Sequence, residues 1–452
     1  MVGAAAREMQ RRGRLLAGES RFRELRESGA TYIDKTALID DMIATDHRFV
    51  LCRPPLFGKT TTVTLLKELF SGHKYLFDGS VGGSRLHICD TPWDWARDVH
   101  EVLHIDLKTM SENPATFRQT LLDWMATKTA ALGGAVSNRD SLKTAVRDLI
   151  RAAADASPSG RCVVLVDNYD APIRQGDPLR MSKPAGFYLL ENAQVLSDWI
   201  SGMRAESVLI RFQFFAGVYK VRLNVFDTAV DLSVSNRFSP LCGFTRRDLI
   251  GHFGDALDDL CDRLDYRGGQ PEALDALDVW FGGYRWGDVP DADQVHNPYA
   301  VVRALIAGEL RPYWSDNIIL PEWVRNQLQG NITTLSDSLS IVPAPFTQRF
   351  GVCVDGARKV VRDALSSDDR MQLPESYDAA SRFDKRGTLL RDQVRLQFLQ
   401  LGLLTVRHVD YDPESLLRIA RLETPNRDVR SLMDRLLSEP SVTSAAQLRT
   451  NP

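Results

Sequence analysis

The feature that most constrains this chain is a short apolar run, a loop and a helical pattern that follow one another near residue 50. Residues 49–52 (FVLC) have the character of a buried strand, and residues 53–60 (RPPLFGKT) form a loop that ends in Gly58, Lys59 and Thr60. The order of strand, loop, Gly-Lys-Thr and helix is the context of a phosphate-binding loop. We therefore predict that backbone amides at the helix start cradle phosphates, that Lys59 neutralises their oxygens and that Thr60 holds Mg²⁺.

A second apolar run, residues 162–167 (CVVLVD), ends in an aspartate about a hundred residues later. Asp167 stands where a Walker B carboxylate holds the metal ion of a phosphate-binding loop. A strand-end aspartate is often only a turn former, so this prediction depends on both motifs occurring together. The next residue is commonly a glutamate that activates water, but here it is Asn168, a catalytic candidate whose amide can orient a water but cannot accept its proton. Asp170 is the candidate substitute base.

The first half of the chain alternates strand-like and helix-like runs, which is typical of a parallel sheet covered by helices on both faces. Four strands are expected at residues 47–52, 102–107, 162–167 and 208–216. Four helices are expected at residues 59–70, 115–132, 141–154 and 185–204, long enough to connect parallel strands. The predicted fold class is therefore α/β.

The second half has a mainly helical pattern from Thr245, which is a plausible N-cap. Two β-prone pieces, residues 402–409 and 416–422, favour a small winged-helix-like module near the end. The expected organisation is a basic leader (1–21), a phosphate-loop domain (22–240), a helical lid (241–335), a C-terminal α+β module (336–438) and a disordered tail (439–452).

Composition excludes several classes of protein. The chain has 452 residues, a formal charge of −3 and no apolar stretch near the ~18 residues of a membrane helix, so no membrane partner is expected. The near-neutral charge gives no support for nucleic acid beyond a local patch. Six scattered cysteines without a C-x-x-C pair fit reduced thiols in the cytoplasm. The arginine-rich leader leaves an export signal, and with it a secreted role, as an alternative.

With these motifs, the chain resembles a family of bacterial P-loop proteins called AAA-ATPase-like. The resemblance rests on residues 22–36 (FRELRESGATYIDKT), on the loop 53–60 and on residues 164–173 (VLVDNYDAPI). It implies binding of ATP or ADP with Mg²⁺, and it makes Arg53 the family's own residue at the first loop position. The nucleotide-binding residues that it implies are Asp34, Lys35, Arg53, Phe57, Gly58, Lys59, Thr60 and Thr61. Asp34 and Lys35, together with Tyr32, are expected on the base or ribose side.

The chain departs from the family pattern mainly at catalytic positions. Pro55 and Leu56 replace two basic residues, Asn168 replaces the glutamate, and Ala216 replaces a threonine that could sense the γ-phosphate. Many relatives continue into a nuclease with a D…[DE]-x-K core. The two lysines after residue 300, Lys359 and Lys385, lack the required acidic residue, so no nuclease site is expected.

Three other patterns allow a functional as well as a structural interpretation. Arg246 and Arg247 fit either an arginine finger or a solvated helix start. Asp106 ends a predicted strand beside Lys108, which favours a salt bridge at the sheet edge. His100 and His104 have a metal-ligand spacing, but they run into a strand, where that spacing separates the rings.

The sequence thus predicts a nucleotide-binding protein with weak or absent hydrolysis that acts as a switch or as an interaction module for an unidentified protein partner. The alternative is an active Mg²⁺-dependent ATPase coupled to a partner protein or nucleic acid. The amide at position 168 favours the first prediction, because loss of a general base typically lowers turnover by roughly 10²–10⁴.

Overall fold

A computed structural model describes residues 15–110, 114–174, 184–220, 228–233, 235–286, 293–320, 325, 348–353, 398–412 and 417–438. Most of the expected basic leader, the expected tail and much of the C-terminal module therefore lie outside the described residues. Within the described ranges, no helix combines the length and the apolar character needed to cross a bilayer.

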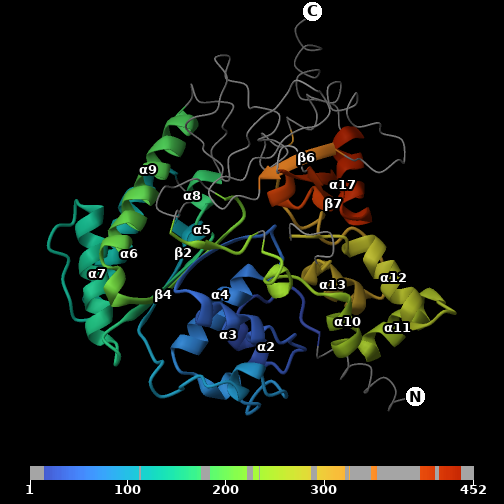
Figure 1. Cartoon of the computed structure of the whole chain (residues 1–452), viewed down its shortest axis with the longest axis horizontal. Helices are drawn as coiled ribbons and strands as arrows, with labels where there is room; N and C mark the ends of the chain where they lie inside the picture. Colours follow the sequence, from blue (N-terminus) through green and yellow to red (C-terminus); the bar gives the residue numbers. More distant parts are fainter. Residues whose placement is uncertain are drawn as a thin grey trace, which may run out of the picture.

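A five-stranded parallel sheet forms the centre of the first half of the chain (Figure 1). Its spatial order is β2-β3-β4-β1-β5, so β4 lies between the strand before the phosphate loop and the strand that ends in Asp167. The strands are β1 (Arg48–Cys52), β2 (Val102–Asp106), β3 (Cys162–Asp167), β4 (Ile210–Gly217) and β5 (Val230–Asp231). Because all run in one direction, their carboxyl ends meet at one edge.

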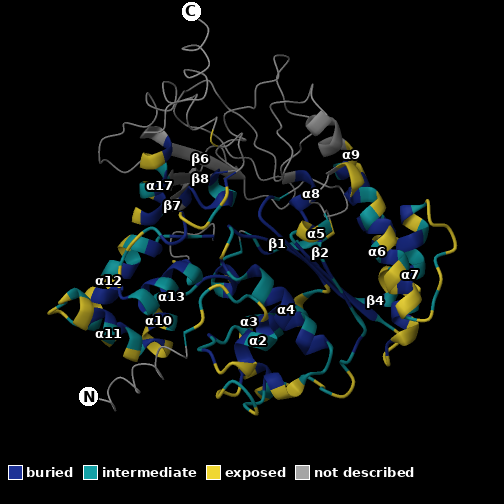
Figure 2. Ribbon diagram, turned by 180° about the vertical axis from the view of Figure 1, so that it is seen from behind, coloured by how far each residue is buried: buried dark blue, intermediate teal, exposed yellow. Residues whose placement is uncertain are grey.

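Helices cover both faces of this sheet. The helices on one face are α6 (Phe117–Ala131), α7 (Leu142–Ala156) and α9 (Pro184–Ala205), and those on the other are α2 (Phe22–Glu27), α3 (Thr36–Thr45) and α4 (Lys59–Phe70). Alternate residues of β1 belong to the two cores: Phe49 and Leu51 to one, Val50 and Cys52 to the other. Figure 2 shows the strands buried and the outer surfaces of α6 and α7 exposed. Two short helices, α5 (Leu107–Met110) and α8 (Ala171–Arg174), follow β2 and β3.

A helical lid lies beside the sheet, on the side where α2 to α4 pack (Figure 1). It comprises α10 (Arg246–His252), α11 (Gly254–Leu264), α12 (Gln270–Phe281) and α13 (Pro298–Ala307). Thr245 caps α10 as predicted, in a reciprocal capping box with Asp248. The apolar core of α2 to α4 continues without interruption into these helices.

The end of the chain forms a separate three-stranded antiparallel sheet, in the order β6-β8-β7, next to helix α17. The elements are β6 (Gln348–Cys353), β7 (Thr405–Asp412), β8 (Leu417–Glu423) and α17 (Arg427–Ser438). The two β-prone pieces predicted here are confirmed as β7 and β8. Leu401, Leu403 and Val429 join the same core as the lid, so this end of the chain is packed against the phosphate-loop half.

Candidate functional site

The phosphate loop connects the end of β1 to the start of α4 and makes a sharp turn at its end. Gly58 is the N-cap residue of α4 with a left-handed φ of 91°, which glycine adopts without strain. No capping side chain accepts a hydrogen bond from the amides in the first turn of this helix. At the other end of the loop, the Arg53 amide donates to Gly217 O at 3.1 Å, which fixes the loop to the end of β4. An uncapped helix start beside a tight loop is a suitable anion site.

The side chain of Lys59 is folded back over its own loop. Its Nζ donates to Arg53 O at 2.9 Å and to Pro54 O at 2.8 Å, and the residue is 6% exposed. The ammonium group is therefore held at the loop by backbone carbonyls, which are neutral and exchangeable partners. A phosphate in the loop would offer a stronger, charged acceptor to the same group.

Thr60 and Asp167 are brought into direct contact. Thr60 Oγ1 donates to Asp167 Oδ2 at 2.6 Å. Burial raises the pKa of Asp167, and the nearby charge of Asp106 raises it further, while the bond from Thr60 opposes both effects. A hydroxyl and a carboxylate are hard oxygen donors of the kind that Mg²⁺ prefers, and Mg²⁺ usually binds one or two carboxylates together with substrate phosphates. The described residues hold no group of three or more His, Cys, Asp or Glu side chains suited to a metal. The donor set thus fits a Mg²⁺ ion that is bound together with a nucleotide.

Asn168 does not face the phosphate loop in the way predicted for a water-orienting residue. Its Nδ2 donates to Asp106 Oδ1 at 2.9 Å, and its amide donates to Asp167 Oδ1 at 2.9 Å. Its φ of 51° is in the left-handed region, which asparagine tolerates better than most residues. The residue therefore links the ends of β2 and β3.

The predicted substitute base, Asp170, has a structural position instead. Its Oδ1 accepts from the Val218 amide at 3.1 Å and its Oδ2 from the Tyr219 amide at 2.9 Å, and the residue is fully buried. A carboxylate whose two oxygens both bind backbone amides stabilises the turn after β4. The prediction that Asp170 activates water is not supported by this geometry.

Two predicted nucleotide-binding residues of the loop, Arg53 and Phe57, are turned into the protein. The Arg53 guanidinium donates to Ser233 O at 2.8 Å and lies 4.8 Å from the centroid of Trp286, and burial lowers its pKa to about 10. The Phe57 ring packs edge-on against Tyr284 at 4.7 Å and Trp286 at 5.6 Å. Both side chains anchor the loop to the lid rather than facing the phosphate position.

The lid and the C-terminal part contact the remaining loop residues, which the sequence did not reveal. Trp314 Nε1 donates to Pro55 O at 3.0 Å, and Asn297 Nδ2 donates to Leu56 O at 3.4 Å. The remaining contact is at Gly402, where an added Cβ would lie 2.8 Å from the Pro54 ring. Every residue from 53 to 57 is therefore in contact with a residue that follows it by more than 200 positions.

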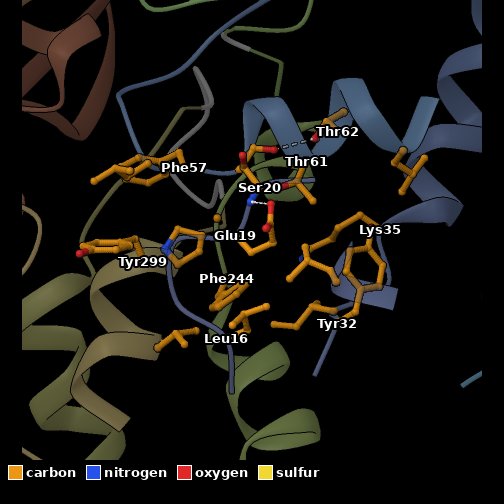
Figure 3. Close-up of a pocket in the computed structure, with 18 of the residues that line it drawn as sticks. Leu16, Glu19, Ser20, Tyr32, Lys35, Phe57, Thr61, Thr62, Phe244 and Tyr299 are labelled. Carbon is orange, nitrogen blue, oxygen red and sulfur yellow. Dashed lines mark hydrogen bonds between the residues drawn. The ribbon is translucent and has the colours of Figure 1, made fainter. Parts of the chain in front are cut away.

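A pocket opens beside the loop, between α4, the lid and the segment that precedes α2 (Figure 3). Its walls are mainly apolar and aromatic, with Lys35 among the few charged groups. The labelled residues in Figure 3 that line it are Leu16, Glu19, Ser20, Tyr32, Lys35, Phe57, Thr61, Thr62, Phe244 and Tyr299. Glu19 accepts hydrogen bonds from the amides of Ser20 and Arg21, and the Arg21 side chain lowers the pKa of its carboxyl to about 2. Pockets of this composition, next to a phosphate loop, suit a planar heterocycle.

The residues predicted on the base or ribose side have different positions. Tyr32 and Lys35 line the pocket, and Lys35 Nζ donates to Asp248 Oδ2 at 2.6 Å. Asp34 is not among the pocket residues: its Oδ1 accepts from the Thr36 amide at 2.8 Å, and its Oδ2 accepts from the His87 amide at 2.7 Å. Asp34 therefore holds the start of α3 and is a structural residue in this geometry.

The arginine-finger alternative finds no support at Arg246. Its guanidinium pairs with Asp278 and, at 2.7 Å, with Asp275, both on α12. The Arg246 side chain therefore connects α10 to α12 within the lid.

Comparisons with known proteins agree with this geometry. Residues 17–226 match the family model described as "Predicted AAA-ATPase". A curated relative from Azotobacter chroococcum mcd 1, the "Uncharacterized protein in vnfD 5'region", is 30% identical over 309 residues, which cover 67% of this chain and 54% of the relative. The chain thus spans about half the length of that relative. No solved structure matches significantly. Residues 17–226, somewhat less than half of the chain, are therefore similar to the family described as "Predicted AAA-ATPase".

Proposed function

We propose that this protein binds ATP or ADP with Mg²⁺, hydrolyses ATP weakly, and works as a switch in which the lid responds to the phosphate loop. The observation that carries the proposal is the contact of all five residues from Arg53 to Phe57 with the lid or the C-terminal part. A loop held in this way cannot rearrange around a phosphate without changing its contacts to the lid.

The groups that would bind the phosphates and the Mg²⁺ ion lie close together. Lys59 would exchange the carbonyls of Arg53 and Pro54 for phosphate oxygens, because a charged acceptor outcompetes neutral ones. Thr60 and Asp167 would hold Mg²⁺, which when bound neutralises charge on the phosphates. The first amides of α4 would donate to the same phosphates.

The pocket beside the loop would receive the nucleoside. It is bounded by Gly58 and Thr61 at the phosphate end and by Tyr32, Phe244 and Tyr299 at the other. Aromatic side chains at the wall offer stacking surfaces for a purine, which is typically worth about 1–3 kcal/mol per base. The occupant would therefore touch α4, the segment before β1 and lid helix α13 at once.

The alternative function is an active ATPase coupled to a partner protein or nucleic acid. Asn168 argues for slow turnover, because an amide at this position supplies no base. The retained Lys59, Thr60 and Asp167 support nucleotide binding under either function.

The first experiment is calorimetric titration of the full chain with ATP, ADP and GTP in Mg²⁺, followed by phosphate release on the same sample. We expect adenine nucleotides to bind and to raise the melting temperature, since a ligand of the folded state stabilises it by RT ln(1 + [L]/Kd). Lys59→Ala should abolish this shift. Lys67→Ala, on the same helix about 12 Å away, is the matched control and should leave it unchanged. Absence of binding by the wild type would refute the proposed function.

The switch itself is tested by amide hydrogen exchange of the lid with and without ADP. Asn297→Asp keeps the oxygen that caps α13 but removes the donor to Leu56 O, and Trp314→Phe removes the donor to Pro55 O. In the wild type, ADP should change exchange in α12 and α13. In the double variant, ADP should still bind and the change in the lid should be lost. An equal change in both proteins would mean that the lid does not respond through these contacts.

A further inference from the structure

A second carboxylate lies at the same edge of the sheet as Asp167. Asp106 ends β2, Asp167 ends β3, and the two are register partners in neighbouring parallel strands. The sequence alone favours only a salt bridge between Asp106 and Lys108 at the sheet edge. Its position at the carboxyl edge of the sheet, next to the metal-binding aspartate, is where ligand-binding groups of parallel sheets gather.

Asn168 connects this carboxylate to the phosphate loop. Its side-chain amide donates to Asp106 Oδ1, and its backbone amide donates to Asp167 Oδ1, both at 2.9 Å. Asp167 in turn accepts from Thr60 at 2.6 Å. A continuous hydrogen-bonded path therefore runs from the first turn of α4 to the end of β2, and the amide at position 168 is what closes it.

Within the described part of the chain, one carboxylate oxygen of Asp106 is left to bind water. Its Oδ1 accepts from Asn168 and from the Lys108 amide at 2.9 Å, while Oδ2 makes no hydrogen bond among the described residues. The residue is only partly buried, so water reaches it. Two further carboxylates near the loop are committed, Asp167 to Thr60 and Asp170 to two backbone amides.

We propose that Asp106, held by Asn168, positions the water that attacks the γ-phosphate of bound ATP. The inference rests on the proposed nucleotide-binding function. In the step, the water oxygen forms a bond to the γ-phosphorus as the bond from phosphorus to the β–γ bridging oxygen breaks. ADP leaves with that electron pair, and the proton of the water passes to the carboxylate. An aspartate has one methylene less than the usual glutamate, which would fit the weak hydrolysis proposed above.

The test is Asp106→Asn in the full chain, with three measurements. Stabilisation by Mg²⁺ and ATP should match the wild type, because the substitution leaves Lys59, Thr60 and Asp167 intact. Phosphate release should fall by roughly 10²–10⁴. Stabilisation by ADP with aluminium fluoride, which needs a water in line with the phosphate mimic, should be lost. Asp106→Glu keeps a carboxylate and should retain measurable turnover.

The matched control is Asp155→Asn, an exposed position on α7, which should change none of the three measurements. If the wild type binds no nucleotide, the proposed function itself fails. If it binds nucleotide but shows no turnover, or if Asp106→Asn releases phosphate at the wild-type rate, the role of Asp106 is overturned. If Asp106→Asn does not fold, Asn168→Ala, which leaves Asp106 without its side-chain donor, takes its place. Unchanged turnover in that variant would equally overturn the inference.

Discussion

Thr60 Oγ1 lies 2.6 Å from Asp167 Oδ2 although the strands that lead to these two residues are not hydrogen-bonded to each other. Strand β4 lies between β1 and β3, and α4 packs against both β3 and β4. The helix start thus spans the width of one strand to bring the hydroxyl to the carboxylate. The pair proposed to bind Mg²⁺ depends on how α4 lies over the sheet as well as on the two motifs themselves.

Replacement of Asp167 by Asn should make the protein without nucleotide more stable at neutral pH. Burial raises the pKa of Asp167, so the folded carboxyl holds its proton more tightly than the unfolded one. The wild type therefore loses stability as pH rises from the ordinary value of 3.8 through the raised pKa. We expect Asp167→Asn to melt at a higher temperature than the wild type at pH 7 and the difference to shrink towards pH 4. Melting curves of both proteins between pH 4 and pH 7 measure this difference in melting temperature.

The same variant should lose the part of nucleotide stabilisation that requires Mg²⁺. Stabilisation by ADP in the presence of a chelator should stay as in the wild type, which serves as the internal control. If Asp167→Asn melts at a lower temperature than the wild type at pH 7, burial is not the main influence on the Asp167 carboxyl.

Introducing the family's glutamate at position 168 should not simply raise activity. The sequence alone predicts a gain of hydrolysis, but a carboxylate at this position would face Asp106 and lose the hydrogen bond between them. We expect Asn168→Glu to destabilise the protein by about 1.5–3 kcal/mol, the range for a hydrogen bond to a charged group. The exchange variant Asn168→Glu with Asp106→Asn restores one amide and one carboxylate, and it should recover most of that loss in urea denaturation. A single variant as stable as the wild type would show that the two side chains are independent.

The helices and strands around the phosphate loop could be predicted from their apolar periodicity and from the residues that flank them. The α4 bounds, Lys59 to Phe70, and the β3 bounds were predicted correctly, because apolar periodicity and the Gly-Lys-Thr start mark them clearly. The meeting of Thr60 with Asp167 followed from the motifs. The bond between Asn168 and Asp106 did not, because the pattern of strands carries no information on their spatial order. The burial of Arg53 against Trp286 also arises from a distant segment, which a local motif cannot indicate.

Gly217 should be sensitive to the smallest enlargement. A Cβ at this position would lie 2.6 Å from the Tyr169 ring and 2.8 Å from Asp170 Oδ1, both in the packed end of the sheet. We expect Gly217→Ala to cost about 1–3 kcal/mol, as overpacking typically does. The matched control is Gly251→Ala in α10, where an added Cβ meets nothing within 4 Å and a gain of about 0.5–1 kcal/mol is expected. Chemical denaturation measures the free energy of unfolding of both variants. Equal changes in the two variants would mean that the end of β4 relaxes to accept the added methyl group.

Asp428 should affect the phosphate loop from a distance. Its carboxylate accepts from the amides of Trp314 at 2.8 Å and Ser315 at 3.0 Å, and it thereby fixes the indole that binds Pro55 O. Asp428→Ala leaves two buried amides unpaired, so we expect a loss of about 2–5 kcal/mol. Nucleotide affinity should fall with it. Asp434→Ala, an exposed position on the same helix, should change neither the melting curve nor the titration. Unchanged nucleotide affinity in Asp428→Ala would show that the loop does not depend on this anchor.

The contact between Pro54 and Gly402 also has a consequence for synthesis of the protein. The two residues are 348 positions apart, and Gly402 has a φ of 83° and packs against the proline ring. At 5–20 residues per second, a ribosome needs roughly 20–70 s to reach Gly402 after it has made Pro54. Trp286, Asn297 and Trp314, further distant neighbours of the loop, also follow it by more than 200 positions, so the nascent loop gains these contacts in turn and the one with Gly402 after them. The loop is therefore made long before the last of the contacts that hold it in the folded protein.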